Sequence, residues 1–343
     1  MRFLFFFIFL NTLFLNLAEA RSAKQKQIVI EAKKIDLEEF SGAFNPSLIK
    51  TDHGFLLTFR YCLHPIYPWI SYIGIAMLDE ELNLVSKPQL LNTREDEALT
   101  PSQAEDARIF TAGNKIYVIY NDNEEVVNPS GSQRRDMFIA EVVHHNGEFK
   151  LEKPLKVMHE KKYAKKNWQK NWVPFEWNNQ ICLGYSIVPH EILTPNIDSG
   201  IACAKSISAI KNSWKWGELR GGTPAILVDD NYLGFFHSSK VSTSSASSNI
   251  PMHHYYMGAY LFSSKPPFDI KKISSSPIVA NGFYTQSDYE KRVIFPGGFA
   301  VVDDTIYLAY GKDDMEVWIA IIHKKNLINS LKSTKKKRQI IFY

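Results

Sequence analysis

Short apolar runs broken by turn-forming residues recur along most of the chain. The runs are rich in Ile, Val, Phe and Tyr, and Asp-His-Gly, Asn-Gly and Asp-Asn separate many of them. Such runs are typical of β-strands, and helical periodicity is scarce. We expect strands at 44–50, 54–61, 72–78, 106–111, 115–120, 136–143, 171–177, 181–187, 200–206, 222–227, 232–238, 255–262, 293–301, 305–310 and 317–322. The pattern predicts an all-β protein.

These strands fall into five similar groups of three. In each group the first strand opens on Pro or an unusual polar residue, at Asn45, Asp106, Pro174, Thr223 and Pro296. Five repeats of roughly fifty to seventy residues predict a five-bladed β-propeller, because a small sheet must bury both faces against its neighbours. The first strands of the blades then line a central channel, so the openings meet at one mouth. A β-sandwich with long loops is the alternative.

The two ends of the chain differ from this pattern. Residues 1–20 contain Arg2, an apolar run and Ala18-Glu19-Ala20, the parts of a cleaved signal peptide. The run is shorter than the ~20 residues of a spanning helix, although an uncleaved anchor is the alternative. We therefore expect a secreted or periplasmic protein with no stable membrane span after cleavage and one propeller domain at 21–331. Residues 332–343 are expected to form a solvated basic tail.

Composition and charge exclude several classes of protein. The chain has 343 residues, 45% of them hydrophobic and 13% aromatic, which excludes a disordered protein. Its net charge is +4, too small to indicate nucleic acid as a partner. No spacing of Cys or His indicates a metal site, and nothing in the sequence requires a cofactor.

An odd number of cysteines permits at most one internal disulfide. Cys182 and Cys203 lie on predicted strands that could be antiparallel neighbours, which would allow a bridge between them. The alternative is that both residues, and Cys62, are buried thiols.

The five strand openings carry the chemistry of a sugar site. Together they supply carboxylate, amide, ammonium, guanidinium and hydroxyl groups, with Trp and Phe beside them. Planar polar groups bind sugar hydroxyls, and an aromatic face packs on the apolar side of a pyranose ring. The openings therefore predict a carbohydrate-binding mouth.

The motifs in this series resemble glycoside hydrolase family 130. In chain order they are Phe44-Asn45-Pro46-Ser47, Glu105-Asp106-x-Arg108, Lys170-Asn171-Trp172-x-Pro174-Phe175, Tyr185-Ser186-x-x-Pro189-His190, Gly221-Gly222-Thr223-Pro224, Tyr256-Met257-Gly258-Ala259, Phe295-Pro296-x-Gly298 and Tyr310-Gly311-x-x-Asp314. The resemblance runs from about residue 40 to 325. It implies a five-bladed propeller that acts on β-mannosides, as an inverting phosphorylase or a hydrolase; a related family contains mannosyltransferases.

The resemblance also implies roles for individual residues. It makes Asp106 the proton donor, although Ala107 stands where the family usually has Pro. An ion-paired strand end is the alternative for this motif. The expected substrate-binding residues are Asn45, Arg60, Glu105, Arg108, Asn171, Trp172, Thr223, Tyr256 and Asp314. The expected phosphate-binding residues are Lys170, His237 and Arg220, with Arg134 and Arg135 as further candidates.

Two of these residues have a structural alternative. His237 follows an apolar run and would also fit a core histidine, and Trp172 would also fit between packed sheets.

The substrate is expected to be an oligosaccharide or a glycoconjugate, and the nucleophile decides the reaction. Phosphorolysis with inorganic phosphate needs a cluster of cations, whereas inverting hydrolysis needs a second carboxylate ~6.5–9.5 Å from the acid. Candidates for that carboxylate are Glu176, Asp288, Glu290 and Asp314. Export weighs against a phosphorylase. A non-catalytic carbohydrate-binding propeller is the alternative from another class.

Overall fold

β-hairpins dominate the computed structural model, which describes residues 27–64, 70–93, 102–123, 134–165, 168–211, 214–243, 248–284 and 292–341. Within these ranges the helices are a 3₁₀ turn, η1 (Tyr163–Lys165), and α2 (Lys324–Ser330). The predicted all-β class is confirmed. The proposed signal peptide lies outside the described residues. No helix in the described ranges has the length and apolar character needed to cross a bilayer.

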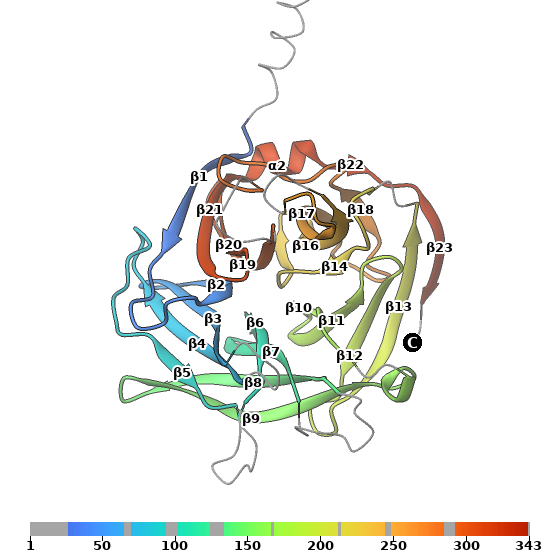
Figure 1. Cartoon of the computed structure of the whole chain (residues 1–343). Coiled ribbons are helices and arrows are strands. Elements are labelled where there is room, and N and C mark those ends of the chain that lie inside the picture. The colour runs from blue at the N-terminus through green and yellow to red at the C-terminus, as the bar shows by residue number, and fades with distance from the viewer. Residues whose placement is uncertain are drawn as a thin grey trace, which may run out of the picture.

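The described strands form four hydrogen-bonded sheets around a common centre (Figure 1). One sheet has the order β2 (Phe44–Thr51), β3 (Gly54–His64), β4 (Ile70–Leu78) and β5 (Gln89–Leu91). A second has the order β1 (Val29–Ile35), β21 (Glu316–His323), β20 (Thr305–Lys312) and β19 (Ile294–Val302). A third contains β14 (Arg220–Gly221), β15 (Ile226–Val228), β16 (Asn231–Ser242), β17 (Met252–Ser263), β18 (Ile270–Ile273) and β22 (Lys332–Ser333).

The nine-stranded sheet consists of two antiparallel groups. The first contains β6 (Glu105–Ala112), β7 (Lys115–Asp122), β8 (Asp136–His145) and β9 (Glu148–His159). The second contains β10 (Val173–Trp177), β11 (Gln180–Ser186), β12 (His190–Pro195), β13 (Ile201–Ile210) and β23 (Lys336–Ile341). Two parallel residue pairs between β13 and β9 join the groups. In Figure 1, β2, β6, β10, β14 and β19 lie nearest the centre.

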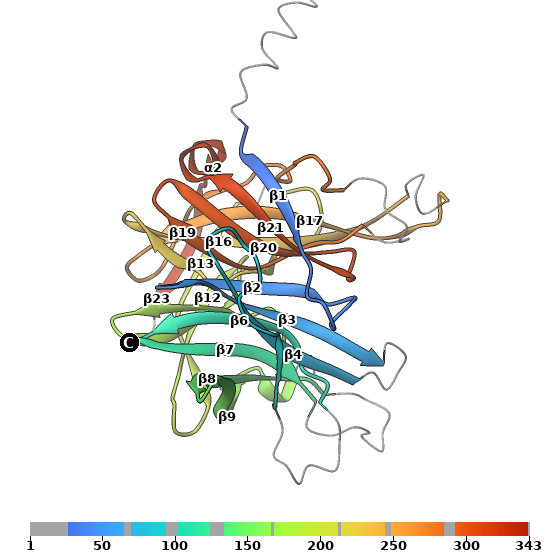
Figure 2. The same cartoon turned by 90° about the vertical axis from the view of Figure 1, so that its left-hand side faces the viewer.

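The first described strand and the last hairpin lie side by side, as Figure 2 also shows. β1 pairs antiparallel with β21, from Val29 opposite Ile322 to Ile35 opposite Val317. Val29 and Ile35 are buried, which explains why this short, lysine-containing segment is held in the sheet. The pairing adds the first described strand to the sheet formed by the last hairpin, nearly 300 positions further along the chain.

The basic C-terminal segment, expected to be a solvated tail, forms strands. Lys332–Ser333 pairs with β18 and Lys336–Ile341 pairs with β13, so both stretches add strands to sheet edges. A sheet edge has unpaired backbone groups, which these strands satisfy, while Lys332 and Ser333 stay exposed.

No disulfide joins Cys182 to Cys203. β12 lies between the strands that carry them, so the two backbones are two strand spacings apart, roughly 10 Å. That separation exceeds the reach of a disulfide. Cys182 is buried but Cys203 is exposed, so the alternative of buried thiols is also wrong for Cys203.

Apolar side chains fill the spaces between neighbouring sheets. Ile109 and Val118 pack with Ile73 and Ile75 from the preceding sheet. This packing fixes the inner strands, and with them the polar residues at their openings, relative to one another.

Candidate active site

Three inner strands open with the same backbone conformation. Asn45, Asp106 and Asn171 have φ angles of 48, 53 and 63°. The strand register slips next to the first two, between Phe44 and Ser47 and between Glu105 and Arg108. Asn and Asp tolerate left-handed backbone better than most residues, and such irregularities redirect side chains. The residue types at these openings therefore fit the backbone that presents them.

The carboxylate of Asp106 lies at the meeting point of two of these openings. Its Oδ1 accepts a hydrogen bond of 2.9 Å from Asn45 Nδ2, and the Arg60 guanidinium lies 3.6 Å away. The Asp106 side chain is 12% exposed. It is therefore tightly held yet still accessible to a ligand.

Positive charge determines the protonation of Asp106. Burial by itself raises the pKa of this carboxyl, but the charges of Arg60 and Arg108 outweigh it. The hydrogen bond from Asn45 and the charge of Lys170 act in the same direction. The pKa of Asp106 is therefore held below its ordinary value, and the unliganded site carries a carboxylate.

Arg60 is fixed in place by Ser71 and Glu105, in addition to its contact with Asp106. Its Nε donates to Ser71 Oγ at 2.9 Å, and its Nη2 forms a 2.8 Å ion pair with Glu105. Glu105 also accepts an ion pair from the fully buried Arg135 at 3.3 Å. Burial opposes the charged form, but Glu105 and Asp106 raise the pKa of Arg60 above its ordinary value. Arg60 is a permanent cation beside Asp106.

Arg108 connects β6 to the segment around β14. It donates to the carbonyl oxygens of Gly222, Gly221 (3.2 Å) and Asp106 (3.0 Å), and to Asn171 Oδ1 at 3.1 Å. Burial lowers the pKa of Arg108 to about 10, against the opposing effect of Asp106, so it stays charged at neutral pH. At 1% exposure it acts on a ligand through its charge and through the loops it holds.

The three predicted phosphate-binding residues lie near one another. Arg220 pairs with His237 in the β14–β16 register. Burial, followed by the charges of Arg108, Arg220 and Lys170, lowers the pKa of His237 to about 3. The imidazole is therefore neutral, and its buried Nδ1 has no hydrogen-bond partner among the described residues. Lys170 forms no ion pair within the described ranges and lies 5.3 Å from the Trp168 ring.

Several residues expected at the site have other surroundings. Trp172 is 1% exposed and packs edge-on against Tyr185 at 5.3 Å, so it offers no face to a sugar. Thr223 is buried, and its Oγ1 accepts a 3.0 Å hydrogen bond from the Phe235 N–H. Tyr256 lines a separate pocket beside α2. Arg134 pairs with Asp136 at 3.0 Å.

Asp314 lies in the turn between β20 and β21, with a φ of 58°. Its charge contributes to the raised pKa of Arg60, which places it near the central cluster. Asp288 and Glu290 lie outside the described residues.

Sequence reasoning missed Trp168. This residue is 39% exposed, and its ring lies 5.7 Å from the Arg135 guanidinium and 5.3 Å from Lys170 Nζ. The next residue, Gln169, donates its N–H to the Arg135 carbonyl at 2.9 Å. Two tryptophans four positions apart flank Lys170-Asn171, and no local pattern distinguishes the exposed one from the buried one.

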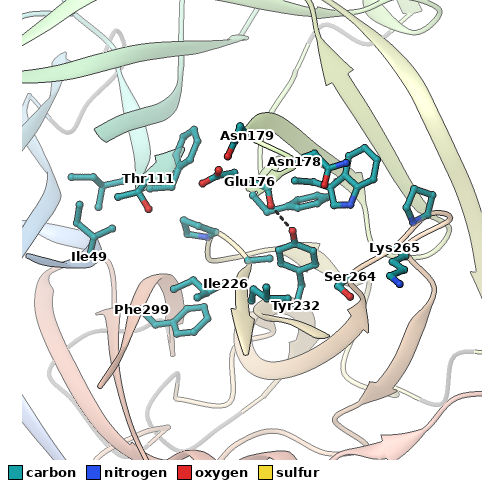
Figure 3. Close-up of a pocket in the computed structure, with 18 residues that line it drawn as sticks. Ile49, Thr111, Glu176, Asn178, Asn179, Ile226, Tyr232, Ser264, Lys265 and Phe299 are labelled. Atoms are coloured by element: carbon teal, nitrogen blue, oxygen red, sulfur yellow. Dashed lines mark hydrogen bonds between the residues drawn. The ribbon is translucent and has the colours of Figure 1, made fainter. Parts of the chain in front are cut away.

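A pocket of about 750 Å³ lies at the far ends of the inner strands (Figure 3). Ile49, Thr111 and Leu227 line it, close to the ends of β2, β6 and β15, whereas Asp106 lies at an opening. Glu176 also lines this pocket, and its carbonyl accepts a hydrogen bond from Tyr232. Glu176 therefore lies at the far end of β10 from the strand openings, and it is unsuited to activate water beside Asp106.

The described residues contain no group of three or more His, Cys, Asp or Glu side chains that could hold a metal ion. The openings offer the carboxylate of Asp106, the ion-paired carboxylate of Glu105, several cations and amides, and an exposed indole.

Comparison with known proteins identifies relatives of this chain. A family profile described as β-1,4-mannooligosaccharide phosphorylase, that of glycoside hydrolase family 130, matches residues 18–333. A 1,2-β-oligomannan phosphorylase from Thermoanaerobacter sp. is 27% identical over 122 residues. That alignment spans 35% of this chain and 38% of the length of the relative.

Solved structures share the fold at low sequence identity. A proposed glycoside hydrolase from Parabacteroides distasonis has a TM-score of 0.61 at 15% identity, over 89% of this chain and 95% of that one. The β-1,2-mannobiose phosphorylase of Listeria innocua, solved with β-1,2-mannobiose, has a TM-score of 0.56 at 15% identity, over 89% and 94% of the two chains. At these identities the similarity concerns the fold.

Proposed function

The chain belongs to glycoside hydrolase family 130, a family of glycoside-active enzymes, and on this basis we propose that it is an inverting phosphorylase of β-mannosides. The observation that carries this proposal is the group of cations around Asp106 and His237. The positive charges of Lys170 and Arg220 contribute to the lowered pKa of His237, which is neutral, and the charge of Lys170 also lowers the pKa of Asp106. A phosphate dianion is the ligand that such a group favours.

We propose that the sheets form five blades. The nine-stranded sheet divides naturally where only two parallel residue pairs join β9 to β13. Each half then has a continuous antiparallel order, as the other three sheets do. This division supports a single ring in which each inner strand contributes one opening to the site.

In the proposed reaction, a phosphate oxygen attacks C1 of the terminal mannosyl unit. The bond between C1 and the glycosidic oxygen breaks on the opposite face, and Asp106 gives its proton to that oxygen. The products are a mannose 1-phosphate of inverted configuration and a glycan shortened by one unit. Lys170, Arg220 and the unpartnered Nδ1 of His237 would hold the phosphate.

The low pKa of Asp106 fits this mechanism because phosphate changes the local charge. The unliganded site favours the carboxylate, which cannot donate a proton. A bound dianion offsets the charges of Arg60, Arg108 and Lys170, so the pKa of Asp106 rises when phosphate is present. Asp106 is then protonated, and able to act as the acid, only in the complex that already holds the phosphate nucleophile.

Hydrolysis is the second candidate, and it requires another carboxylate at the site. Glu105 is engaged by Arg60 and Arg135, and Glu176 lies in the pocket of Figure 3. Asp314 is therefore the candidate among the described residues. A hydrolase would be inactivated by Asp314→Asn and would not depend on phosphate.

Incubation with β-1,2- and β-1,4-linked manno-oligosaccharides, with and without phosphate, tests the proposal. Mannose 1-phosphate formed only with phosphate supports it. Free mannose without phosphate identifies a hydrolase, and longer oligosaccharides identify a transferase. An inert protein that binds the sugar would be a binding module.

We also propose that the protein is exported. Export weighs against phosphorolysis, and we give the cations around Asp106 and His237 more weight in the choice of reaction. The apolar run and Ala18-Glu19-Ala20 support a leader that is cleaved after Ala20. N-terminal sequencing of protein recovered from outside the cytoplasm should begin at Arg21. Intact Met1 would contradict cleavage.

A further inference from the structure

A second pocket lies on the outer part of the molecule, beside α2. It has a volume of about 1110 Å³, and we call it the rim pocket. Its walls come from α2, β17, β22, the segment after β18 and the segment before β14, elements at the outer edge in Figure 1 or next to it. Its lining includes Trp216, Tyr256, Ser275, Ser276, Tyr284 and Asn329.

Aromatic rings form one wall of the rim pocket. The Tyr256 and Tyr284 rings lie 5.5 Å apart at 45°, and Trp216 is also half-buried. The Tyr284 hydroxyl is fixed, because it donates to the Ile278 carbonyl and accepts from the Met257 N–H, both at 3.1 Å. Among the described residues, no hydrogen bond engages the Tyr256 hydroxyl or the Trp216 indole N–H. Both groups are available to a ligand beside an apolar face.

Neutral polar groups also line the rim pocket. Asn329 and Asn326 project from α2, and Asn326 donates to the Gln27 carbonyl at 2.9 Å, which leaves its own oxygen available. Ser275 and Ser276 are exposed at the edge. Amides and hydroxyls that both donate and accept match the hydroxyl groups of a sugar.

Among the described residues that line the rim pocket none is acidic, and Lys332 is the one that carries a charge. Cleavage of a glycoside needs a proton donor, so this pocket is suited to hold a glycan and unsuited to cleave one. A lining that combines aromatic rings with neutral polar groups favours an uncharged pyranose chain over an anionic or cationic ligand.

We propose that the rim pocket is a second carbohydrate-binding site, which holds a part of the glycan away from the reacting end. The choice of β-mannan as its ligand rests on the proposed function, whereas the existence of the site does not. A bound polymer would remain associated with the protein between successive reactions, which raises the local concentration of chain ends.

Affinity electrophoresis in gels containing soluble β-mannan tests the site. The double variant Trp216→Phe, Asn329→Ala keeps the ring packing on Trp214 and improves helix propensity, so it should fold. We expect its dissociation constant for mannan to rise at least about fivefold, as expected for lost hydrogen bonds of about 1 kcal/mol. Lys325→Ala, exposed on α2 but outside the pocket, is the matched control and should bind as the wild type does.

Turnover of a soluble mannobiose, measured on the same proteins, reports on the central site separately. Equal retardation of the double variant and the wild type would overturn the proposal, as would no retardation by β-mannan, α-mannan or β-glucan. Retardation by α-mannan or β-glucan alone would keep the site but reject its ligand. Failure of the proposed function would appear instead as no turnover by the wild type, whatever the gels show.

Discussion

The side-chain amide of Asn45 donates a 2.9 Å hydrogen bond to the carboxylate of Asp106, 61 positions further along the chain. Both residues have left-handed backbone at the opening of an inner strand. The amide favours the charged form of Asp106, which must accept a proton before it can act as an acid.

Replacing this amide with a carboxylate tests how Asp106 is tuned. Asn45→Asp preserves shape and tolerates the same φ, but it places a like charge beside Asp106 and raises the pKa of the pair. The general acid then keeps its proton to higher pH, so the alkaline limb of kcat/KM for the glycan, measured at saturating phosphate, should move upward by about one pH unit or more. Asn146→Asp, at an exposed turn with a φ of 52°, is the control. If the alkaline limb did not shift, protonation of Asp106 would not control the rate.

Lys170 tests the phosphate site. Lys170→Met removes a cation that forms no ion pair within the described ranges, while retaining a similar chain length. Loss of a charge-assisted hydrogen bond of about 1.5–3 kcal/mol should raise KM for phosphate roughly 10- to 150-fold. KM for the glycan should change little. Lys165→Met, exposed on η1, serves as the control, and equal effects of both variants would refute a specific role for Lys170.

Trp168 is expected to contact the sugar beyond the scissile bond. Trp168→Ala should raise KM for the glycan about tenfold, a loss of about 1.4 kcal/mol, and leave KM for phosphate unchanged. Leu227→Ala removes another exposed apolar side chain, in the pocket of Figure 3, and should leave both constants unchanged. A fall in kcat alone would indicate a role other than binding.

Two buried histidines should make the fold sensitive to acid. Burial lowers the pKa of His237 to about 3 and that of His190 to about 4, from 6.5. Below pH 6.5 the unfolded chain takes up protons that the folded chain refuses, so stability falls as pH decreases. Each histidine should cost about 2 kcal/mol between pH 7 and 5.

Urea unfolding at pH 7 and pH 5 measures this loss. His190→Gln and His237→Gln should each reduce the difference between the two pH values. A wild-type free energy of unfolding that is the same at both would contradict the assignment of neutral buried histidines.

The inner hairpins were readable from the sequence because their apolar alternation and turns are strong. The predicted strand at 305–310 corresponds to β20, and that at 115–120 to β7. The outer strands were missed for a physical reason: β9 is half-exposed and rich in Lys and Glu, and β1 pairs with a strand nearly 300 positions away. Such strands are selected by an available sheet edge rather than by local pattern.

The same distinction applies to the site. Residue types at the openings indicated Asp106 and its cations, because charged groups at adjacent openings must share one mouth. Trp172 is buried whereas Trp168 is exposed, and Tyr256 lines the rim pocket rather than the central site. Both outcomes depend on how neighbouring sheets pack. Local sequence carries little information about that packing.

The most direct test of the account is ³¹P NMR of the reaction of a β-linked manno-oligosaccharide with phosphate, for the wild type and Asp106→Asn. Wild-type protein should produce α-mannose 1-phosphate, and Asp106→Asn should be slower by about 10²- to 10⁴-fold. Because Asn tolerates the φ of 53° and can still accept the hydrogen bond from Asn45, the variant should fold normally. A product of β configuration, or equal rates for the two proteins, would contradict the account.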